Sequence, residues 1–242
     1  MAYVEHVVAS PLVSCTWEQW TGVRHQQRVV PDACVDLIWS GRGLTIAGPD
    51  TRPRLIALAP GTRMVGVRLR PGVAGAVLGL PACELRDAAP GAADVLGATA
   101  VDALLDELGT GGDARAILLR AVERTAPRRP DPLTAAAIDR LDRPQARVAA
   151  VADELGLSAR QLQRRIADAV GYGPKTLARI LRFRRLQSLA AAPAVDHREP
   201  APLADLALDA GYADQAHMTA EVTRLAGIPP VRFLKDRTPT AA

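Results

Sequence analysis

Two stretches of the chain, about 55 residues apart, repeat one pattern of helix, glycine turn and helix. The first is VAAVADELGLSARQLQRRIADAVG at residues 148–171, and the second is LADLALDAGYADQAHMTAEVTRLAG at residues 203–227. When the two copies are aligned on their turn glycines, Gly156 and Gly211, their apolar positions coincide if one extra residue is allowed in the turn of the second copy. This repeat constrains the fold more than any other feature, because both copies must bury the same face of a short helix pair.

The first copy carries local signals for two helices. Gly156 ends the first helix, and Ser158 with Gln161 three residues later forms a capping box for the second. That second helix, over 159–170, buries one apolar side and leaves long polar side chains outside: Arg160, Gln161, Gln163, Arg164 and Arg165. A short amphipathic pair with such an open face is typical of a DNA-reading helix-turn-helix.

The second copy has a Gly211 turn, an Asp214 N-cap and a helix that buries Met218 and Val222. Between the copies lies PKTLARILRFRRLQSLAA, a predicted helix over about 174–192. It is long enough to hold two helix-turn-helix units roughly one DNA turn apart. The first unit is expected at about 147–170 and the second at about 202–226, so one chain would probe two successive major-groove segments.

Charge supports a polyanionic partner for this region. Residues 128–242 hold 18 basic and 13 acidic side chains, whereas residues 1–127 hold 12 and 13. Within 160–185 there are eight basic residues against one acid. Arg179, Arg182 and Arg185 on the linker helix either contact DNA phosphates or solvate the helix surface, and the sequence leaves both open.

These motifs, over about residues 131–237, resemble the AraC/XylS family of bacterial regulators. The resemblance implies that Arg160, Gln163 and Arg164 read bases from the first unit, with phosphate contact as the alternative, and that Gln215, Ala216 and Ala220 are the matching positions in the second. Position 220 often carries a long basic side chain in that family, so the second unit is expected to bind phosphates more than it reads bases. The expected DNA-binding set is Ser158, Arg160, Gln161, Gln163, Arg164, Arg165, Arg179, Arg182, Asp214, Gln215, Ala216, Thr219 and Ala220.

The part before residue 127 is of another kind. Runs such as LVSCTWEQW, QQRVV, CVDLIWS and RMVGVRLR predict short strands, and alanine- and leucine-rich helical stretches follow Pro71. We expect an α+β protein with a β-rich domain at 1–126 for effector binding or dimerisation, a proline-rich linker at 127–132 and an all-α DNA-binding domain at 133–242. The first domain resembles the sensor domains of AraC-type regulators, which implies a small barrel or cupin-like fold.

Candidate effector-binding residues lie on the predicted strands: Trp17, Cys34, Asp36, Trp39 and Arg68. The tryptophans either line an effector pocket or pack in the core, and core packing is the favoured interpretation. Asp36 and Arg68 either orient a polar ligand or pair with one another. Cys34, expected in a strand, is interpreted as a small buried side chain, with a thiol, redox or metal sensor as the alternative. The cysteine and histidine spacing predicts no metal site, and no cofactor is expected.

The sequence shows no serine-hydrolase, zinc-protease or phosphate-loop motif, so no enzyme is expected, and an alkyl-transfer repair enzyme fused to the DNA module is the distant alternative. No apolar run is long enough to cross a membrane, and the expected location is the bacterial cytoplasm. The expected partners are double-stranded promoter DNA, RNA polymerase, an unidentified small effector and a second copy of the chain. No association with a membrane is expected. Direction of regulation and operator sequence do not follow from these residues.

Overall fold

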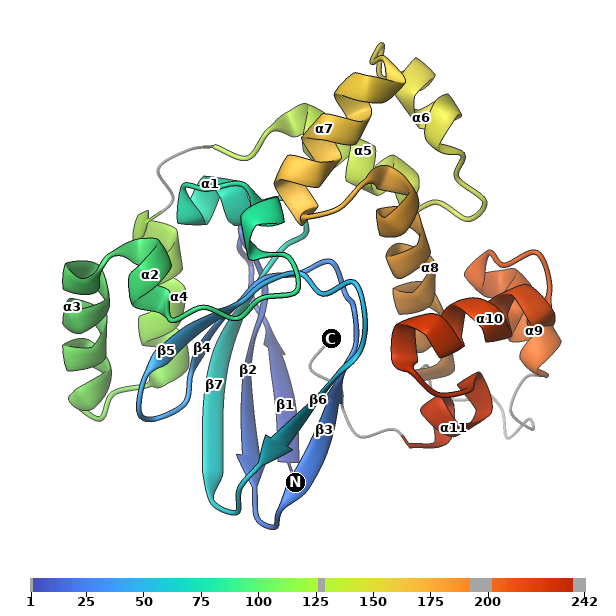
Figure 1. Cartoon of the computed structure of the whole chain (residues 1–242). Coiled ribbons are helices and arrows are strands. Elements are labelled where there is room, and N and C mark those ends of the chain that lie inside the picture. Colours follow the sequence, from blue (N-terminus) through green and yellow to red (C-terminus); the bar gives the residue numbers. More distant parts are fainter. Residues whose placement is uncertain (1, 126–128, 192–201, 237–242) are drawn as a thin grey trace.

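The computed structural model describes residues 2–125, 129–191 and 202–236. An antiparallel β part with helices packed on it is followed by a part made only of helices (Figure 1). This confirms the α+β fold class. The first two residues of the expected linker at 127–132 lie outside the described residues. Its last two residues belong to the next helix, with Asp131 as the N-cap and Pro132 as the first helical residue. Position 192, at the expected end of the linker helix, also lies outside the described residues.

Seven strands build the β part: β1 Ala2–Val7, β2 Val13–Thr21, β3 His25–Val29, β4 Asp36–Trp39, β5 Leu44–Ala47, β6 Arg54–Leu58 and β7 Thr62–Leu69. Five form one antiparallel sheet in the order β1-β2-β7-β4-β5, and β3 pairs with β6 in a second sheet. The expected strands correspond to β2, β3, β4 and β7. The sequence reasoning did not anticipate β1, β5 or β6 as strands.

Cys34 does not lie in a strand, so that expectation was wrong. It precedes β4, because Ala33 has a positive φ of 67° and the Asp32 carboxylate accepts a hydrogen bond from the Cys34 backbone N–H at 2.9 Å. An aspartate that bonds the backbone two residues on makes a turn, which interrupts extended pairing. The alternation in PDACVDLIW therefore begins only at Asp36.

A glycine in β7 makes room for the largest side chain of the β core. Trp17 of β2 stands opposite Gly66 in the register and is 2% exposed. A Cβ atom at position 66 would lie 2.2 Å from Cε2 of the Trp17 ring, well inside van der Waals contact. The ring therefore rests on the backbone of β7, and only glycine fits there.

Helices cover one face of the large sheet (Figure 1). They are α1 Ala74–Leu78, the 3₁₀ helix η1 Ala82–Leu85, α2 Ala92–Leu96, α3 Ala98–Gly109 and α4 Ala114–Thr125. Val13 and Val67 from the sheet form one core with Leu104 of α3 and Leu118 of α4. This confirms that the alanine- and leucine-rich stretches fold as helices packed on the sheet.

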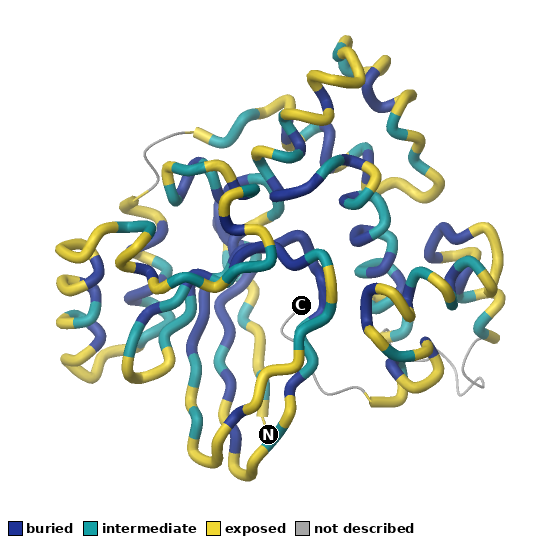
Figure 2. Tube along the Cα trace, in the orientation of Figure 1, coloured by how far each residue is buried: buried dark blue, intermediate teal, exposed yellow. Residues whose placement is uncertain are grey.

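The all-α part contains α5 Pro132–Leu141, α6 Val148–Glu154, α7 Ala159–Val170, α8 Pro174–Ala191, α9 Leu203–Ala210, α10 Gln215–Ala226 and α11 Pro230–Lys235. The predicted tandem helix-turn-helix units are confirmed as α6–α7 and α9–α10, with α8 between them. Ile166 and Val222 are fully buried in one core with Phe183 of α8, and in Figure 2 buried and exposed residues follow one another along the helices of this part. No helix in the described ranges is both long and apolar enough to span a membrane.

We predict that Gly66→Ala lowers the free energy of unfolding by about 1–3 kcal/mol, the usual cost of overfilling a packed core. The measurement is the midpoint of thermal unfolding. Gly43→Ala is the matched control, because nothing lies within 4 Å of its Cβ position and its φ is not in the left-handed region. Equal midpoints for the two variants would contradict the role given to Gly66.

Candidate nucleic-acid interface

Helix α7 is fixed at its first turn by side chains that the sequence places there. Ser158 Oγ accepts a hydrogen bond from the Gln161 backbone N–H at 3.2 Å, and Gln161 Oε1 accepts one from the Ser158 N–H at 2.8 Å. This is the predicted capping box. Its inward side buries Leu162 and Ile166, so the orientation of the helix about its own axis is set by the core.

The outward side of α7 carries two exposed guanidinium groups without a partner among the described residues. Arg160 and Arg164 are exposed, are four residues apart and make no hydrogen bond or ion pair there. Residues at this spacing lie on one face of a helix. Gln163 is also exposed, and its amide lies against Gly173, where an added Cβ would be 2.4 Å from Nε2. The face therefore offers two free hydrogen-bond forks, with an amide over the following turn.

Helix α10 repeats α7 in length and in both caps. Asp214 accepts a hydrogen bond from the His217 backbone N–H at 2.7 Å, and Gly227 ends the helix in the left-handed region as Gly171 ends α7. Counted from the N-caps, Arg160 corresponds to Ala216, Gln163 to Thr219 and Arg164 to Ala220.

This count corrects one expected match, because Gln215 stands at the position of Ala159 and has no long counterpart on α7. Gln215, Ala216 and Ala220 are exposed, and Thr219 is half-buried. The two outward faces therefore differ in chemistry, although the helices that carry them are alike.

The arginines of α8 are occupied within the protein. Arg179 Nε lies 3.0 Å and Arg182 Nε 4.0 Å from the carboxylate of Glu221 on α10, and the Arg182 guanidinium also lies over the Tyr212 ring. Arg185 pairs with Asp142 at 2.8 Å and donates a hydrogen bond to the Ala210 carbonyl. These contacts bind α8 to its neighbours, and contact with DNA phosphates stays a prediction for the three arginines.

Glu221 is the residue that sequence reasoning missed. It also lies 3.4 Å from His217, one turn earlier on the same helix, and its side chain is 12% exposed. Only the His217 contact could have been read from an i, i+4 spacing. Arg165 is likewise engaged, 2.6 Å from the Asp131 carboxylate at the start of α5. Arg165 was expected to face outward from α7 together with four other polar residues. It is instead turned toward the start of α5.

Helices α7 and α10 both end against the same loop of the β part, residues 48–53 between β5 and β6. A Cβ at Gly171 would lie 2.6 Å from Pro49 Cγ, and one at Gly227 would lie 3.2 Å from Pro53 Cγ. The two glycines occupy equivalent positions in the repeat and both have φ values that favour glycine. The loop thus contacts both helix-turn-helix units at the same point of each.

Two arginines add hydrogen bonds between the parts. Arg28 Nη1 of β3 donates to the carbonyl of Ala226, the last residue of α10, at 2.8 Å, and Arg184 Nη1 of α8 donates to the Asp32 carbonyl at 3.2 Å. A cation at the carbonyl end of a helix is favourable because it meets the negative end of the helix dipole. The spacing of the sequence contains no signal for either contact, since the partners are 198 and 152 residues apart.

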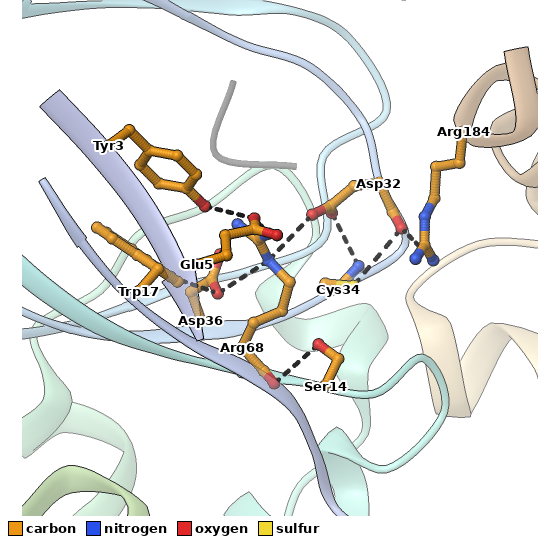
Figure 3. A network of polar contacts seen from close by, with 9 residues as sticks. All are labelled: Tyr3, Glu5, Ser14, Trp17, Asp32, Cys34, Asp36, Arg68 and Arg184. Atoms are coloured by element: carbon orange, nitrogen blue, oxygen red, sulfur yellow. Dashed lines mark hydrogen bonds and ion pairs between the residues drawn. The ribbon is translucent and has the colours of Figure 1, made fainter. Parts of the chain in front are cut away.

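Asp32 belongs to a buried charge network (Figure 3). Its centre is Arg68, 3% exposed, whose guanidinium lies 2.8 Å from Glu5, 3.3 Å from Asp36 and 3.5 Å from Asp32. Burial alone would lower the pKa of Arg68, but Asp36 and Asp32 raise it, so the guanidinium stays charged. Arg68 and Asp36 are therefore an internal ion pair, one of the two outcomes that the sequence left open.

Three of the five expected effector residues line one small cavity. Trp17, Cys34 and Asp36 surround a space of about 80 Å³ between the two sheets. Arg68 lies behind Asp36, and the Trp17 Nε1–H donates to Asp36 at 3.2 Å. Trp39 is half-buried and packs against the core on the helix side of the sheet, because successive residues of β4 point to opposite faces.

Cys34 is enclosed in this cavity wall. Burial raises the pKa of its thiol well above the ordinary value, and the neighbouring Asp32 carboxylate adds to the rise. A protonated thiol is a poor nucleophile and a poor metal ligand. Among the described residues no group of three or more histidine, cysteine, aspartate or glutamate side chains could hold a metal ion.

A larger cavity, of about 350 Å³, lies on the helix side of the sheet. Its wall is apolar, with Leu37 and Leu69 from the strands and Leu104 from α3, and Glu107 and Arg124 stand at its polar edge. Glu107 is already paired with Arg124 at 3.3 Å and with Arg120 at 3.0 Å. No local pattern in the sequence indicates this cavity, because its residues have the spacing of ordinary core positions.

Two known families match the chain, one within the β part and one within the all-α part. Residues 151–236 match a family model described as a helix-turn-helix domain, and residues 9–90 match one described as a domain of unknown function, DUF6597. No protein with a curated description matches the chain. The first match runs from within α6 to the end of α11, so the C-terminal part of the chain is a helix-turn-helix domain.

Solved structures show similarity at low identity. The C-terminal domain of AraT, a response regulator from Geobacillus stearothermophilus, is 19% identical over 44% of this chain and 87% of its own, with a TM-score of 0.39. ToxT from Vibrio cholerae is 11% identical over 97% of this chain and 98% of its own, with a TM-score of 0.47. ToxT bound to an unsaturated fatty acid is 11% identical over 99% and 100%, with a TM-score of 0.46.

We predict that Glu221→Ala lowers the free energy of unfolding by about 1–3 kcal/mol, because it leaves two half-buried guanidinium groups without their carboxylate. Glu154→Ala is the control: Glu154 also pairs with two arginines, Arg140 and Arg143, but is 47% exposed. Its loss should cost about 0.5 kcal/mol or less. Urea denaturation of both variants measures the difference, and equal losses would refute the role of Glu221 as the link between α8 and α10.

A pH dependence is expected from Asp50 in the loop that contacts both units. Burial raises the pKa of Asp50 to about 6, although Arg54 at 2.9 Å lowers it. The folded protein thus holds this proton more tightly than the unfolded chain, where the carboxyl has a pKa near 3.8. Stability from this group is therefore lost as pH rises from about 4 to about 6 and is constant above that range.

Replacement of Asp50 by asparagine should remove this loss. The difference in unfolding midpoint between the wild-type protein and the Asp50→Asn variant, measured across pH 4 to 7, should fall until about pH 6 and then level off. A difference that does not change with pH would show that Asp50 titrates alike in the folded and unfolded states.

Proposed function

We propose that this chain is a DNA-binding transcription regulator of the AraC type, in which α7 and α10 enter two successive major-groove segments on one side of a duplex. The match of residues 151–236 to a helix-turn-helix domain supports this. The major groove of B-DNA is wide enough for an α-helix, whose first turns then meet the base edges. The observation that carries the proposal is the equivalence of these helices. They have the same length, and each has a side-chain N-cap, a glycine C-cap and an outward face that the protein leaves uncovered.

On α7 the proposed base readers are Arg160 and Arg164, with Gln163 beside them. An arginine fork bonds guanine O6 and N7 together, and a glutamine amide does the same with adenine N6 and N7. Freedom from internal partners supports this role, since an arginine already paired would have to give up that partner on binding. Ser158 and Gln161 hold the first turn, whose backbone N–H groups attract phosphate.

The other residues of the expected DNA-binding set take supporting roles in this proposal. Asp214 holds the first turn of α10 as Ser158 holds that of α7. Arg179 and Arg182 keep α8 against α10 through Glu221, and Arg165 keeps α7 against α5. These residues set the distance and angle between the two recognition helices.

We further propose that a small effector acts through the β part. The candidate pocket is the cavity formed by Trp17, Cys34 and Asp36, with Arg68 behind it, and Trp39 supports it from the opposite face of β4. A route to the DNA-binding part is provided by Asp32, whose carboxylate faces Arg68 while its carbonyl accepts from Arg184 of α8. An effector changes DNA affinity only through unequal affinity for two arrangements of these contacts.

The thiol-sensing alternative is less well supported than ligand binding. Burial raises the pKa of Cys34 and keeps the thiol protonated, although Arg184 and Arg68 act in the opposite direction. Its sulfur donates to the Asp32 carbonyl at 3.6 Å. Replacing Cys15, Cys34 and Cys83 together separates the two ideas, because only a thiol sensor would lose its response. RNA polymerase and a second copy of the chain are the proposed protein partners of the DNA-bound regulator.

The proposal predicts that Arg164→Ala weakens binding to a selected DNA site by about 1–3 kcal/mol and relaxes specificity at one base pair. The selected site comes from random duplexes enriched on the full-length protein, and affinity is measured by fluorescence anisotropy at fixed salt. Arg42→Ala, at an exposed arginine in the β4–β5 turn, should leave affinity unchanged.

Two results would contradict this assignment. An equal loss on every sequence, with a smaller salt dependence, would make Arg164 a phosphate contact. Enrichment of no sequence at all, with no protection of duplex DNA at moderate salt, would refute sequence-specific binding by this chain.

A further inference from the structure

The outward face of α10 is lined by methyl groups and one amide. Gln215, Ala216, Thr219, Ala220 and Thr223 surround a single shallow hollow on this helix. No charged residue contributes to it. The corresponding face of α7 carries Arg160 and Arg164. The two probes of one protein therefore present opposite chemistries to the base pairs that they meet.

The threonine hydroxyls on this face are already used. Thr219 Oγ1 donates to the Gln215 carbonyl at 2.8 Å, and Thr223 Oγ1 donates to the Thr219 carbonyl at 2.7 Å. A hydroxyl has one proton to donate, and each is committed to the helix backbone four residues earlier. For an approaching base, Thr219 and Thr223 thus offer methyl groups and no hydrogen-bond donor.

The charges near α10 do not alter this chemistry. Glu221 is surrounded by Arg179, Arg182 and His217, so its carboxylate is compensated within the protein. Arg224 is in the last turn, away from the end of the helix that leads into the groove. The remaining polar group of the hollow is the exposed amide of Gln215 in the first turn.

We propose that α10 reads A·T pairs, by packing Ala216, Thr219 and Ala220 against thymine methyl groups while Gln215 bonds an adjacent adenine. The thymine C5-methyl is the one apolar group that a base displays in the major groove, and alanine and the threonine methyl are its usual contacts. Small side chains also let the helix lie deep enough to touch it. This inference rests on the proposed function and assigns the two half-sites different content, guanine under α7 and thymine under α10.

The test uses the duplex selected by the full-length protein and replaces thymine with deoxyuridine, which removes only the methyl group. Substitution in the half-site under α10 should weaken binding about fourfold for each contacted thymine, the factor expected for one buried methyl-sized group. The same substitution in the half-site under α7 or in the flanks should change affinity less than twofold. Footprinting with hydroxyl radicals assigns the half-sites.

A variant links the effect to named side chains. Ala220→Ser puts a hydroxyl into the hollow. In this variant the deoxyuridine penalty, which is the ratio of affinities for the thymine and the deoxyuridine duplex, should fall toward one at one thymine position. Ala135→Ser, at an exposed position of α5 outside the hollow, should keep the full penalty. Circular dichroism of both variants verifies that their helical content is that of the wild-type protein.

The outcomes separate this inference from the proposed function. Specific binding with G·C pairs enriched under α10, or with no penalty for deoxyuridine there, overturns thymine reading and leaves the regulator proposal intact. A penalty that persists in full in Ala220→Ser overturns the role of that residue. Absence of any sequence-dependent binding overturns the regulator proposal and thymine reading with it.

Discussion

The loop at residues 48–53 fixes the relation between the two parts of the molecule. Pro49 lies under the end of α7 and Pro53 under the end of α10, at glycines that occupy the same place in each repeat. Two probes must keep a defined separation if both are to fit one duplex, because the distance between successive major-groove segments is set by the DNA. The loop and α8 together hold that separation. Any change in the β part that shifts this loop acts on both recognition helices at once.

The buried network around Arg68 connects the candidate effector cavity to the same interface. A guanidinium that is 3% exposed requires compensating carboxylates, and Glu5, Asp32 and Asp36 provide them from three different segments of the chain. Asp32 is held on one side by Arg68 and offers its carbonyl to Arg184 on the other (Figure 3). The interior of the β part and the linker helix of the DNA-binding part therefore share a residue. Movement of one has a direct physical path to the other.

The two recognition helices show how a repeat diverges without losing its framework. The length of the helix, a side-chain N-cap, a glycine C-cap and three equivalent buried positions are shared by α7 and α10, because the core and the turn impose them. The outward residues are free of those constraints, and they have become arginine on one helix and alanine on the other. Three arginines of α8 contribute to the positive charge of this region of the sequence. In the structure they form ion pairs with Glu221 and Asp142 and so connect α8 to its neighbours. A basic stretch in a sequence thus includes arginines that are paired within the protein as well as arginines, such as Arg160 and Arg164, that have no internal partner among the described residues.

The sequence alone determined the tandem units, their caps, the α+β class and the exposure of Arg160 and Arg164. Each of these depends on interactions between residues a few positions apart, and such interactions are legible as spacing. Only the tertiary structure decided the partners of Arg179 and Arg165, the place of Cys34 outside β4, the separation of Trp39 from the cavity that holds Trp17, and the contact of one loop with both helix ends. Those contacts join segments that are distant in the sequence. Which long side chain meets which carboxylate follows from how the elements pack, and no local pattern records it.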